Sequence, residues 1–373
     1  MGLTSKTVLA LAILAATLLF IGTIVFWPRL AHRTWRAVSG RAVLLLATQV
    51  MVFASVGLVA NQSFGFYASW ADLLGKETDQ GVVVDQTAGA RGGVRTISTQ
   101  SVDVPGGHLP RVGGQIQKIG VVGKKTGITS PAYVYLPPEY FQQQYAERTF
   151  PVVVVLTGYP GTAKALVTKL DFPDTAHELV RDGRSQPMIL VMLRPTVAPP
   201  RDTECVDVPG GPQTETFFAQ DLPAALAAHY RVGSRPGSWG IIGDSTGGYC
   251  ALKLAMHHPR AYTAAVGLSP YYRAPVDATT GDLFQGDGKL KRHADLEWYI
   301  EHMPPPDVSL LVTTSRHGET NYGPTMRFVD LVKKRAPTRI STIVLESGGH
   351  NFNTWRREIP ASLEWLSGRL TDR

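Results

Sequence analysis

From about residue 115 onward, short apolar runs alternate along the chain with stretches of helical periodicity. The later runs are continuous β-branched and aliphatic residues, typical of strands buried on both faces. This alternation predicts a mostly parallel sheet with helices on both faces, preceded by two antiparallel strands. We expect strands at residues 116–122, 132–136, 152–156, 188–193, 239–242, 264–268, 309–313 and 342–345. We expect helices at residues 163–171, 174–182, 215–229, 247–257, 324–335 and 355–366.

The first sixty residues are predicted to form a transmembrane helical hairpin. Residues 7–27 and 42–60 carry no charged side chain, and each run is long enough to cross the ~30 Å hydrocarbon core of a bilayer as a helix. The segment from Trp27 to Arg41, where the two runs are joined, contains four arginines and two tryptophans. Because cationic short loops stay on the cytoplasmic side, we expect this loop inside, and the N-terminus and residues 61–373 outside.

Two other interpretations of this region stay open. One is a cleaved signal peptide followed by a single buried helix, and the other places both runs in a soluble core. Residues 61–115 are weakly periodic and rich in glycine, so they are expected to be a juxtamembrane linker with one or two strands at most. Residues 116–373 are then the catalytic domain.

The net charge of +7 does not indicate a nucleic-acid partner. The first sixty residues contain five basic residues and no acid, and therefore supply +5 of this charge. The rest of the chain is nearly neutral, which argues against a surface that binds phosphates.

The strongest local motif is Gly-Asp-Ser-Thr-Gly at residues 243–247, between a predicted buried strand and a predicted helix. Its pattern, G-x-S-x-G, places a serine on a sharp strand-to-helix turn, and the glycines leave space for the neighbouring backbone. Ser245 is therefore the candidate nucleophile, with the N-terminus of the helix directed at its oxygen. The alternative is a chance pentapeptide in a chain rich in glycine.

A serine nucleophile needs a base and an acid that orients the base. His350 lies in a Gly-Gly loop between the last predicted strand and the last helix, at the edge where open α/β sheets place their chemistry. Glu319 lies in the loop after the preceding strand. We predict them as base and acid; a surface glutamate paired with Arg316 is the simpler interpretation of Glu319.

An oxyanion hole requires two backbone donors. The N–H of Thr246 follows the nucleophile, and the N–H of Tyr159 lies in the turn after the strand at 152–156, although an ordinary tight turn is the alternative there. The two cysteines, Cys205 and Cys250, both lie on the predicted outside, where a disulfide is permitted. Two separate buried thiols remain the alternative.

Five segments together resemble the putative-esterase branch of the α/β-hydrolases, which includes esterase D, feruloyl esterases and mycobacterial mycolyltransferases. They are VYLPPEY at 134–140, FPVVVVLTGYPG at 150–161, TETF at 214–217, GDSTGG at 243–248 and GGHNFNTW at 348–355. The resemblance implies an α/β-hydrolase fold in which Ser245 is the nucleophile, His350 the base and Glu319 the acid. It implies backbone donors at Tyr159 and Thr246.

Details of the resemblance bear on the substrate. A glutamate at the acid position is similar to the mycolyltransferases, and the membrane hairpin resembles actinobacterial cell-envelope members of the branch. The family's usual His-Gly after the third strand is Thr157-Gly158 here, and its usual methionine after the serine is Thr246. The sugar-binding residues of the mycolyltransferases are not matched around this turn, where Thr157 and Pro160 stand instead.

Two insertions are expected to form the substrate pocket. They cover residues 201–214 and 271–306, and the second contains Tyr271, Tyr272, Phe284, Trp298 and Tyr299. Aromatic side chains over the mouth of a site suit an acyl chain or an aryl group, but they can equally pack the insertion onto the domain.

We therefore predict a membrane-anchored, extracytoplasmic serine esterase or acyltransferase acting on an acyl-ester or lipid substrate. The alternative is a non-catalytic envelope protein that uses the same fold to bind lipid or a partner. The sequence contains no metal-ligand cluster and no nucleotide-binding loop, so no cofactor and no metal are expected. It does not identify the acyl group, the acceptor or the oligomeric state.

Overall fold

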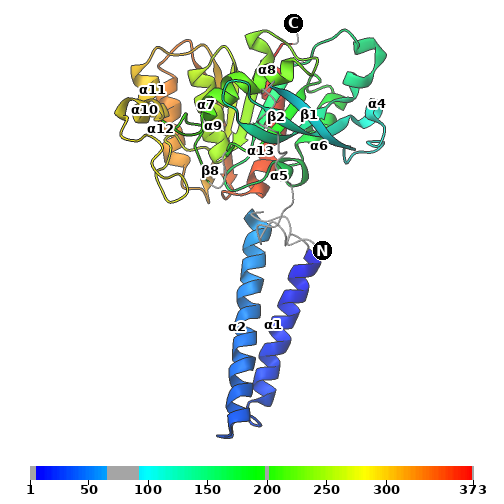
Figure 1. Cartoon of the computed structure of the whole chain (residues 1–373), viewed down its shortest axis with the longest axis vertical. Helices are drawn as coiled ribbons and strands as arrows, with labels where there is room; N and C mark the ends of the chain where they lie inside the picture. The colour runs from blue at the N-terminus through cyan, green and yellow to red at the C-terminus, as the bar shows by residue number, and fades with distance from the viewer. Residues whose placement is uncertain (1–5, 65–91, 198–200, 372–373) are drawn as a thin grey trace. The chain divides into compact units, whose positions relative to one another are not determined.

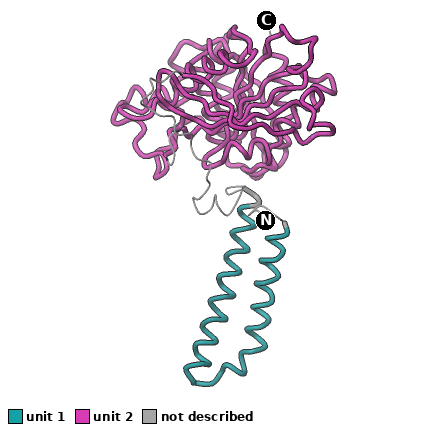
Figure 2. The backbone as a smooth tube through the Cα atoms, turned by 45° about the vertical axis from the view of Figure 1, so that its right-hand side comes forward, with its two compact units in different colours: residues 1–80 teal, residues 81–373 magenta. Residues whose placement is uncertain are grey.

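The computed structural model describes residues 6–64, 92–197 and 201–371. The chain divides into two units, Met1–Gln80 and Gly81–Arg373 (Figure 2). The predicted spans and the predicted catalytic core therefore fall in different units, and each is described by itself.

The first unit is a pair of long helices, α1 (Lys6–Phe26) and α2 (Trp35–Phe64), joined by a short turn (Figure 1). The hydroxyls of Thr23 and Thr48 lie 3.3 Å apart across the pair. Most of the large apolar side chains of both helices remain exposed; Phe53, for example, is 75% exposed. The stretches Thr7–Phe26 and Trp35–Asn61 are long and apolar enough to cross a bilayer. A large exposed apolar surface of this kind suits lipid rather than water.

The second unit is built on a nine-stranded sheet with the order β1-β2-β3-β5-β4-β6-β7-β8-β9. The strands β1, β2, β3 and β5 pair antiparallel, and the pairs from β5–β4 to β8–β9 are all parallel. In chain order the strands are β1 (Gly93–Gln100), β2 (Gln115–Val122), β3 (Thr129–Leu136), β4 (Val152–Leu156), β5 (Ile189–Leu193), β6 (Trp239–Asp244), β7 (Ala264–Leu268), β8 (Ser309–His317) and β9 (Arg339–Ser347).

Helices cover both faces of this sheet. Apolar residues of α8, α9, α11 and α12 join one buried cluster, and those of α5, α6 and α13 join the cluster on the other face. The helices are α4 (Pro110–Gly113), α5 (Ala163–Thr168), α6 (Phe172–Arg181), α7 (Thr214–Thr216), α8 (Leu222–Ala227), α9 (Thr246–His257), α10 (Gly288–His293), α11 (Leu296–His302), α12 (Tyr322–Val332) and α13 (Phe352–Ser367). A π-helical turn, Phe217–Asp221, joins α7 to α8. Short 3₁₀ turns occur at Pro138–Phe141, Gln143–Tyr145 and Pro236–Ser238. The result is the α/β architecture expected from the alternation.

The strand register brings three loops to one edge of the sheet. Leu156 at the end of β4 pairs with Gly243 of β6, and Asp244 pairs with Leu268 at the end of β7. The chain therefore leaves these three neighbouring strands at the same, carboxyl edge. In parallel sheets this edge is where ligands and chemistry are placed.

The sequence-based expectation allowed one or two strands within residues 61–115 without placing them. The structure has strand β1 there, as a third antiparallel strand beside the two that were expected. Most residues of β1 are exposed, and buried and exposed residues do not alternate along it, which explains why its sequence lacks the apolar pattern of a strand. The insertion at 271–306 contains the helices α10 and α11, which were not predicted.

Candidate active site

The serine of the G-x-S-x-G motif stands on a tight turn between β6 and α9. Ser245 has a φ of 52° and a ψ of −118°, and non-glycine residues rarely adopt a positive φ. A Cβ added at Gly247 would lie 2.2 Å from the carbonyl oxygen of Leu156, and one added at Gly243 would lie 2.3 Å from the backbone of Gly247. Only glycine allows this approach of β4, β6 and α9, so the motif's spacing follows from packing around the serine.

His350 contacts the serine directly. Its Nε2 lies 2.8 Å from Ser245 Oγ. His350 lies in the loop between β9 and α13. Its ring packs edge-on against Trp355 of α13, with the two centroids 5.1 Å apart. Desolvation lowers the pKa of His350, so the neutral ring that accepts a proton from serine is favoured. When Nε2 accepts from serine, the proton of the neutral ring is on Nδ1.

Glu319 faces the other side of this ring. Its Oε1 lies 3.9 Å from His350 Nδ1, an ion-pair distance that is longer than a hydrogen bond. The carboxylate is held elsewhere: Oε2 accepts from the N–H of Ser315 at 2.8 Å, and Oε1 accepts from the hydroxyl of Ser269. The Glu319 side chain is 1% exposed, and burial raises its pKa.

A second buried group of polar residues lies behind Glu319. The Nε1 of Trp355 donates to Ser269 Oγ at 2.9 Å, and the Ser269 N–H donates to Thr313 Oγ1 at 3.0 Å. Thr313 Oγ1 in turn donates to Glu358 Oε2 at 2.7 Å. Sequence reasoning missed Ser269 and Glu358. Ser269 could have been predicted, because it directly follows β7 at the carboxyl edge of the sheet. Glu358 lies on a helix, and its position in the sequence gave no such indication.

The turn after β4 lies against Ser245. A Cβ added at Gly158 would lie 2.9 Å from Ser245 Cβ. The N–H of Gly158 donates to Oδ2 of the fully buried Asp244 at 2.8 Å, so the residue before the serine anchors this turn. Burial raises the pKa of Asp244 to about 7. The next residue, Tyr159, precedes Pro160 through a cis peptide bond.

The structure joins Cys205 and Cys250 in a disulfide. The bond attaches the insertion at 201–214 to α9, the helix that begins directly after Ser245. The two insertions also pack on each other, because Val206 and Val208 share a buried cluster with Leu283.

The aromatic side chains of the second insertion mostly pack it onto the domain. Tyr272 stacks on Phe328 with centroids 4.3 Å apart, and Tyr299 stacks on His257 at 4.5 Å. Phe284 belongs to the cluster shared by the insertions, and Trp298 stacks on a histidine one turn later. Of the five aromatics singled out in the sequence, only Tyr271 reaches the residues around Ser245, through Thr246.

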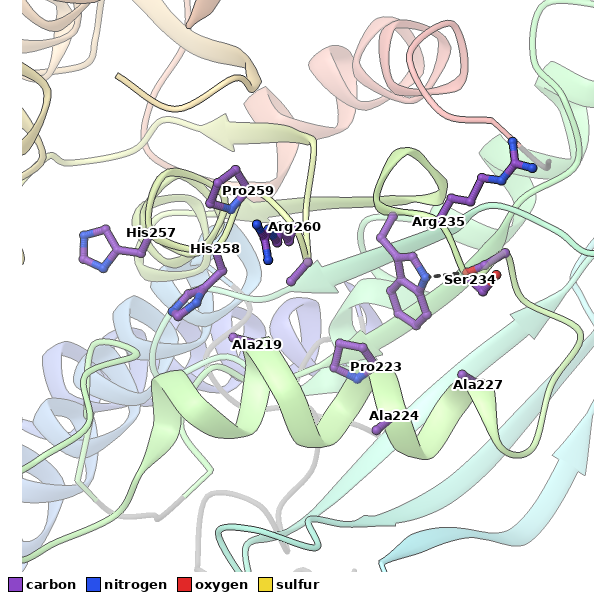
Figure 3. A pocket seen from close by; sticks show the side chains of 13 residues that line it. Ala219, Pro223, Ala224, Ala227, Ser234, Arg235, His257, His258, Pro259 and Arg260 are labelled. Atoms are coloured by element: carbon purple, nitrogen blue, oxygen red, sulfur yellow. Dashed lines mark hydrogen bonds between the residues drawn. The ribbon is translucent and has the colours of Figure 1, made fainter. Parts of the chain in front are cut away.

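A groove with a volume of about 580 Å³ lies elsewhere on the second unit. It is lined by Trp239 at the start of β6, by α8 and by the residues that follow α9 (Figure 3). Trp239 Nε1 donates to the carbonyl of Gly233 in its wall. Since Ser245 follows the other end of β6, roughly 20 Å away at ~3.3 Å per residue, this groove is separate from the serine site. Within the described part of the chain, no cluster of three or more His, Cys, Asp or Glu side chains is arranged to hold a metal ion.

Comparison with known proteins agrees with this fold. A ferulic acid esterase superposes with a TM-score of 0.58 at 18% identity, over 68% of this chain and 98% of its own. An S-formylglutathione hydrolase from Agrobacterium tumefaciens superposes with a TM-score of 0.57 at 17% identity, over 74% and 100% of the two chains. These likenesses establish the α/β-hydrolase fold.

An uncharacterized protein of Corynebacterium glutamicum is 26% identical over 257 residues, which is 64% of this chain. The match spans only 57% of the length of that curated relative. The family model described as "Putative esterase" matches residues 124–366, well over half of the chain. The chain therefore belongs to the putative esterase family of α/β-hydrolases.

Proposed function

We propose that this protein is a membrane-anchored serine esterase or acyltransferase whose catalytic unit lies outside the cytoplasmic membrane. Ser245 is the nucleophile, His350 the general base, and Glu319 the acid that orients the imidazole. The backbone N–H groups of Thr246 and Tyr159 form the oxyanion hole. The observation that carries the proposal is the 2.8 Å contact between His350 Nε2 and Ser245 Oγ on a strained strand-to-helix turn.

The chemistry follows from these positions. Ser245 Oγ attacks the ester carbonyl carbon while its proton moves to His350 Nε2, and the carbonyl oxygen becomes an oxyanion. Collapse of this intermediate expels the alcohol, which takes the proton from His350, and leaves an acyl group on Ser245. Water, or the hydroxyl of an acceptor, then loses its proton to His350 and attacks the acyl carbonyl carbon. Collapse of this second intermediate breaks the bond to Ser245 Oγ and releases the free acid or the new ester, and Ser245 Oγ takes the proton back from His350.

The position of the turn after β4 supports the assignment of Tyr159. A Cβ added at Gly158 would lie only 2.9 Å from Ser245 Cβ, so the peptide that follows Gly158 is close to the proposed nucleophile. The helix that starts at Thr246 adds a favourable dipole for an oxyanion. The proposal does not specify the acyl group of the ester substrate. A ferulic acid esterase and an S-formylglutathione hydrolase share this fold, so the scaffold is compatible with both aryl and small acyl groups.

The cellular location is argued from the first unit. Four arginines lie in or beside the turn between α1 and α2, and cationic short loops stay in the cytoplasm. Both ends of the hairpin, and with them the second unit, are then outside. The disulfide supports the same side, because such bonds persist in oxidising compartments.

Reporter fusions after Arg373 test this topology. A phosphatase that is active only outside the cytoplasm is expected to be active there, and a cytoplasm-only fluorescent reporter to be dark. The reverse pattern contradicts the proposed side. Mass spectrometry of the mature protein adds a second readout, since loss of α1 would identify a cleaved signal peptide instead of an anchor.

The catalytic assignment is tested with a fluorophosphonate probe and a short-chain nitrophenyl ester. Ser245→Ala is expected to abolish labelling and to lower kcat by several orders of magnitude, because it removes the oxygen that forms the acyl bond. Ser234→Ala is the matched control, since Ser234 is exposed and lies in the groove at the far end of β6. Unchanged labelling of Ser245→Ala refutes the nucleophile.

The competing function is a non-catalytic protein that binds lipid or a partner on the same fold. It predicts a folded wild-type protein that neither labels with the probe nor hydrolyses the ester. Adding a primary alcohol to the ester assay then separates the two enzymatic outcomes. A transferase forms the new ester in proportion to the alcohol, whereas a hydrolase releases mainly the free acid.

A further inference from the structure

Thr246, which follows the nucleophile, is attached by its side chain to the second insertion. Its Oγ1 lies 3.0 Å from the hydroxyl oxygen of Tyr271. The same Tyr271 oxygen lies 2.6 Å and 2.8 Å from the two carboxyl oxygens of Glu204, in the first insertion. The Tyr271 hydroxyl donates to Thr246 or to Glu204 and lies within hydrogen-bond distance of both. A continuous hydrogen-bond chain therefore runs from Thr246 through Tyr271 to Glu204.

Both ends of this chain are fixed to α9. Glu204 precedes Cys205, whose disulfide partner Cys250 lies on the first turns of the helix. The carbonyl oxygen of Cys205 also accepts from Lys253 Nζ at 2.6 Å. The ring of Tyr271 stacks on another residue of α9, Tyr249, with centroids 5.1 Å apart. The two insertions thus hold the carboxyl of Glu204 and the hydroxyl of Tyr271 in place against the helix that starts beside Ser245.

Burying Glu204 and holding its backbone at a positive φ both cost free energy of folding, which a purely structural contact would not need. Glu204 is 1% exposed, and burying a carboxyl group in this way is unfavourable unless it is paired. Burial raises its pKa to about 8, and Asp202 two residues earlier opposes ionisation further. Both Glu204 and Cys205 have positive φ, 49° and 50°, which non-glycine residues rarely adopt. Buried acids and strained backbone together, beside a nucleophile, are typical of residues kept for function.

We propose that Tyr271 and Glu204 are positioning residues that hold Thr246 so that its N–H is aimed at the developing oxyanion. The inference rests on the proposed function and deepens it. Without these hydrogen bonds, the Thr246 hydroxyl loses its contact with Tyr271, and the first turn of α9 loses its hydrogen bond to the second insertion. The donor matters when charge develops on the carbonyl oxygen, so its displacement raises the barrier more than it weakens substrate binding.

The test compares two adjacent tyrosines in full-length protein. Tyr271→Phe removes the hydroxyl of the chain and keeps the ring that stacks on α9. Tyr272→Phe is the matched control, because it also removes a buried hydroxyl, one that lies 3.1 Å from Thr325 Oγ1. Tyr271→Phe is expected to lower kcat and the fluorophosphonate labelling rate about tenfold with KM nearly unchanged, less than loss of a donor itself. Tyr272→Phe is expected to leave both near wild type.

Two further variants guard against an ambiguous fold effect. Glu204→Gln keeps the size of the side chain and an acceptor oxygen, so it is expected to retain most of the activity. Glu204→Ala is expected to lower kcat as much as Tyr271→Phe does. Thr246→Val keeps the backbone N–H and removes the hydroxyl. Thr246→Val should lower kcat as much as Tyr271→Phe does. The double variant that combines them should have the same kcat as either single variant, because both substitutions break the same hydrogen-bond chain.

Equal kcat for the Tyr271→Phe and Tyr272→Phe variants overturns the inference, as does full additivity in the double variant. Neither result touches the proposed function as long as Ser245→Ala is inactive. If Ser245→Ala retains wild-type labelling, the proposed function fails first, and the inference fails with it.

Discussion

At the scale of single residues, the site depends on side chains whose protonation is set by burial. His350 contacts Ser245 at 2.8 Å but stands 3.9 Å from the carboxylate of Glu319. Glu319 is instead held by Ser269 and by the N–H of Ser315. The Glu319 carboxylate, the proposed acid, is therefore fixed in place by partners other than the imidazole.

The pH dependence of the esterase reaction follows from the base. Desolvation lowers the pKa of His350 from its ordinary value of 6.5, and only the neutral ring accepts the proton of Ser245. Activity is therefore lost as the pH falls through a value below 6.5. A pH profile of kcat/KM with a nitrophenyl ester is expected to have its acid midpoint below 6.5. A midpoint clearly above 6.5 contradicts this assignment of the base.

Several of the residues that support the site were not predictable from the sequence. Asp244 occupies a variable position of the G-x-S-x-G motif, and its bond to Gly158 exists only because β4 and β6 are neighbours. Glu204 and Tyr271 are 67 residues apart in sequence. Their contact depends on how two irregular insertions fold on each other, which no local periodicity specifies.

At the scale of elements, prediction from the sequence succeeded where burial is complete. Strands β4 and β7 have the expected bounds because every one of their residues is buried, which leaves a continuous apolar run. Strands β8 and β9 are longer than expected, because their ends carry exposed or polar residues. Strand β1 is almost entirely exposed, so its pairing with β2, rather than its own pattern, defines it.

The disulfide is the element-scale feature with the clearest expected effect on stability. It closes a loop with a sequence separation of 45 residues, for which the loss of chain entropy in the unfolded state stabilises by about 2–4 kcal/mol. The double variant Cys205→Ser/Cys250→Ser is expected to lose that amount, measured by denaturant unfolding of the full-length protein in detergent. Added reductant should destabilise wild type to the same extent and leave the variant unchanged. Equal midpoints for wild type and variant would show that no such bond stabilises the protein.

At the scale of the whole molecule, the second unit contains several buried acids with raised pKa values. Burial raises the pKa of Glu358 and of Glu204 to about 8, and that of Asp244 to about 7. Between about pH 4.5 and 8 the folded protein keeps protons that the unfolded chain has released. Stability from these groups therefore falls as the pH rises through that window.

Glu358→Gln tests this dependence. The side chain is fully buried, and its Oε1 is without a hydrogen-bond partner in the described structure. The amide removes the ionisation, so the variant is expected to melt roughly 2–6 °C above wild type at pH 8 and close to it at pH 5. Glu301→Gln, on the exposed side of α11, is the control expected to show no such trend. A difference that stays constant with pH would mean that Glu358 does not titrate in this range.

The bond between Cys205 and Cys250 bears on when the site is complete, given the location and the roles proposed above. A copy whose second unit is to be exported starts in the reducing cytoplasm, where its two thiols remain separate. Until they are oxidised, the loop that carries Glu204 has no covalent attachment to α9. On the proposal that Glu204 helps to position Thr246, full turnover then arrives only after export and oxidation, and a newly made copy is latent toward the esters of the cell that produced it.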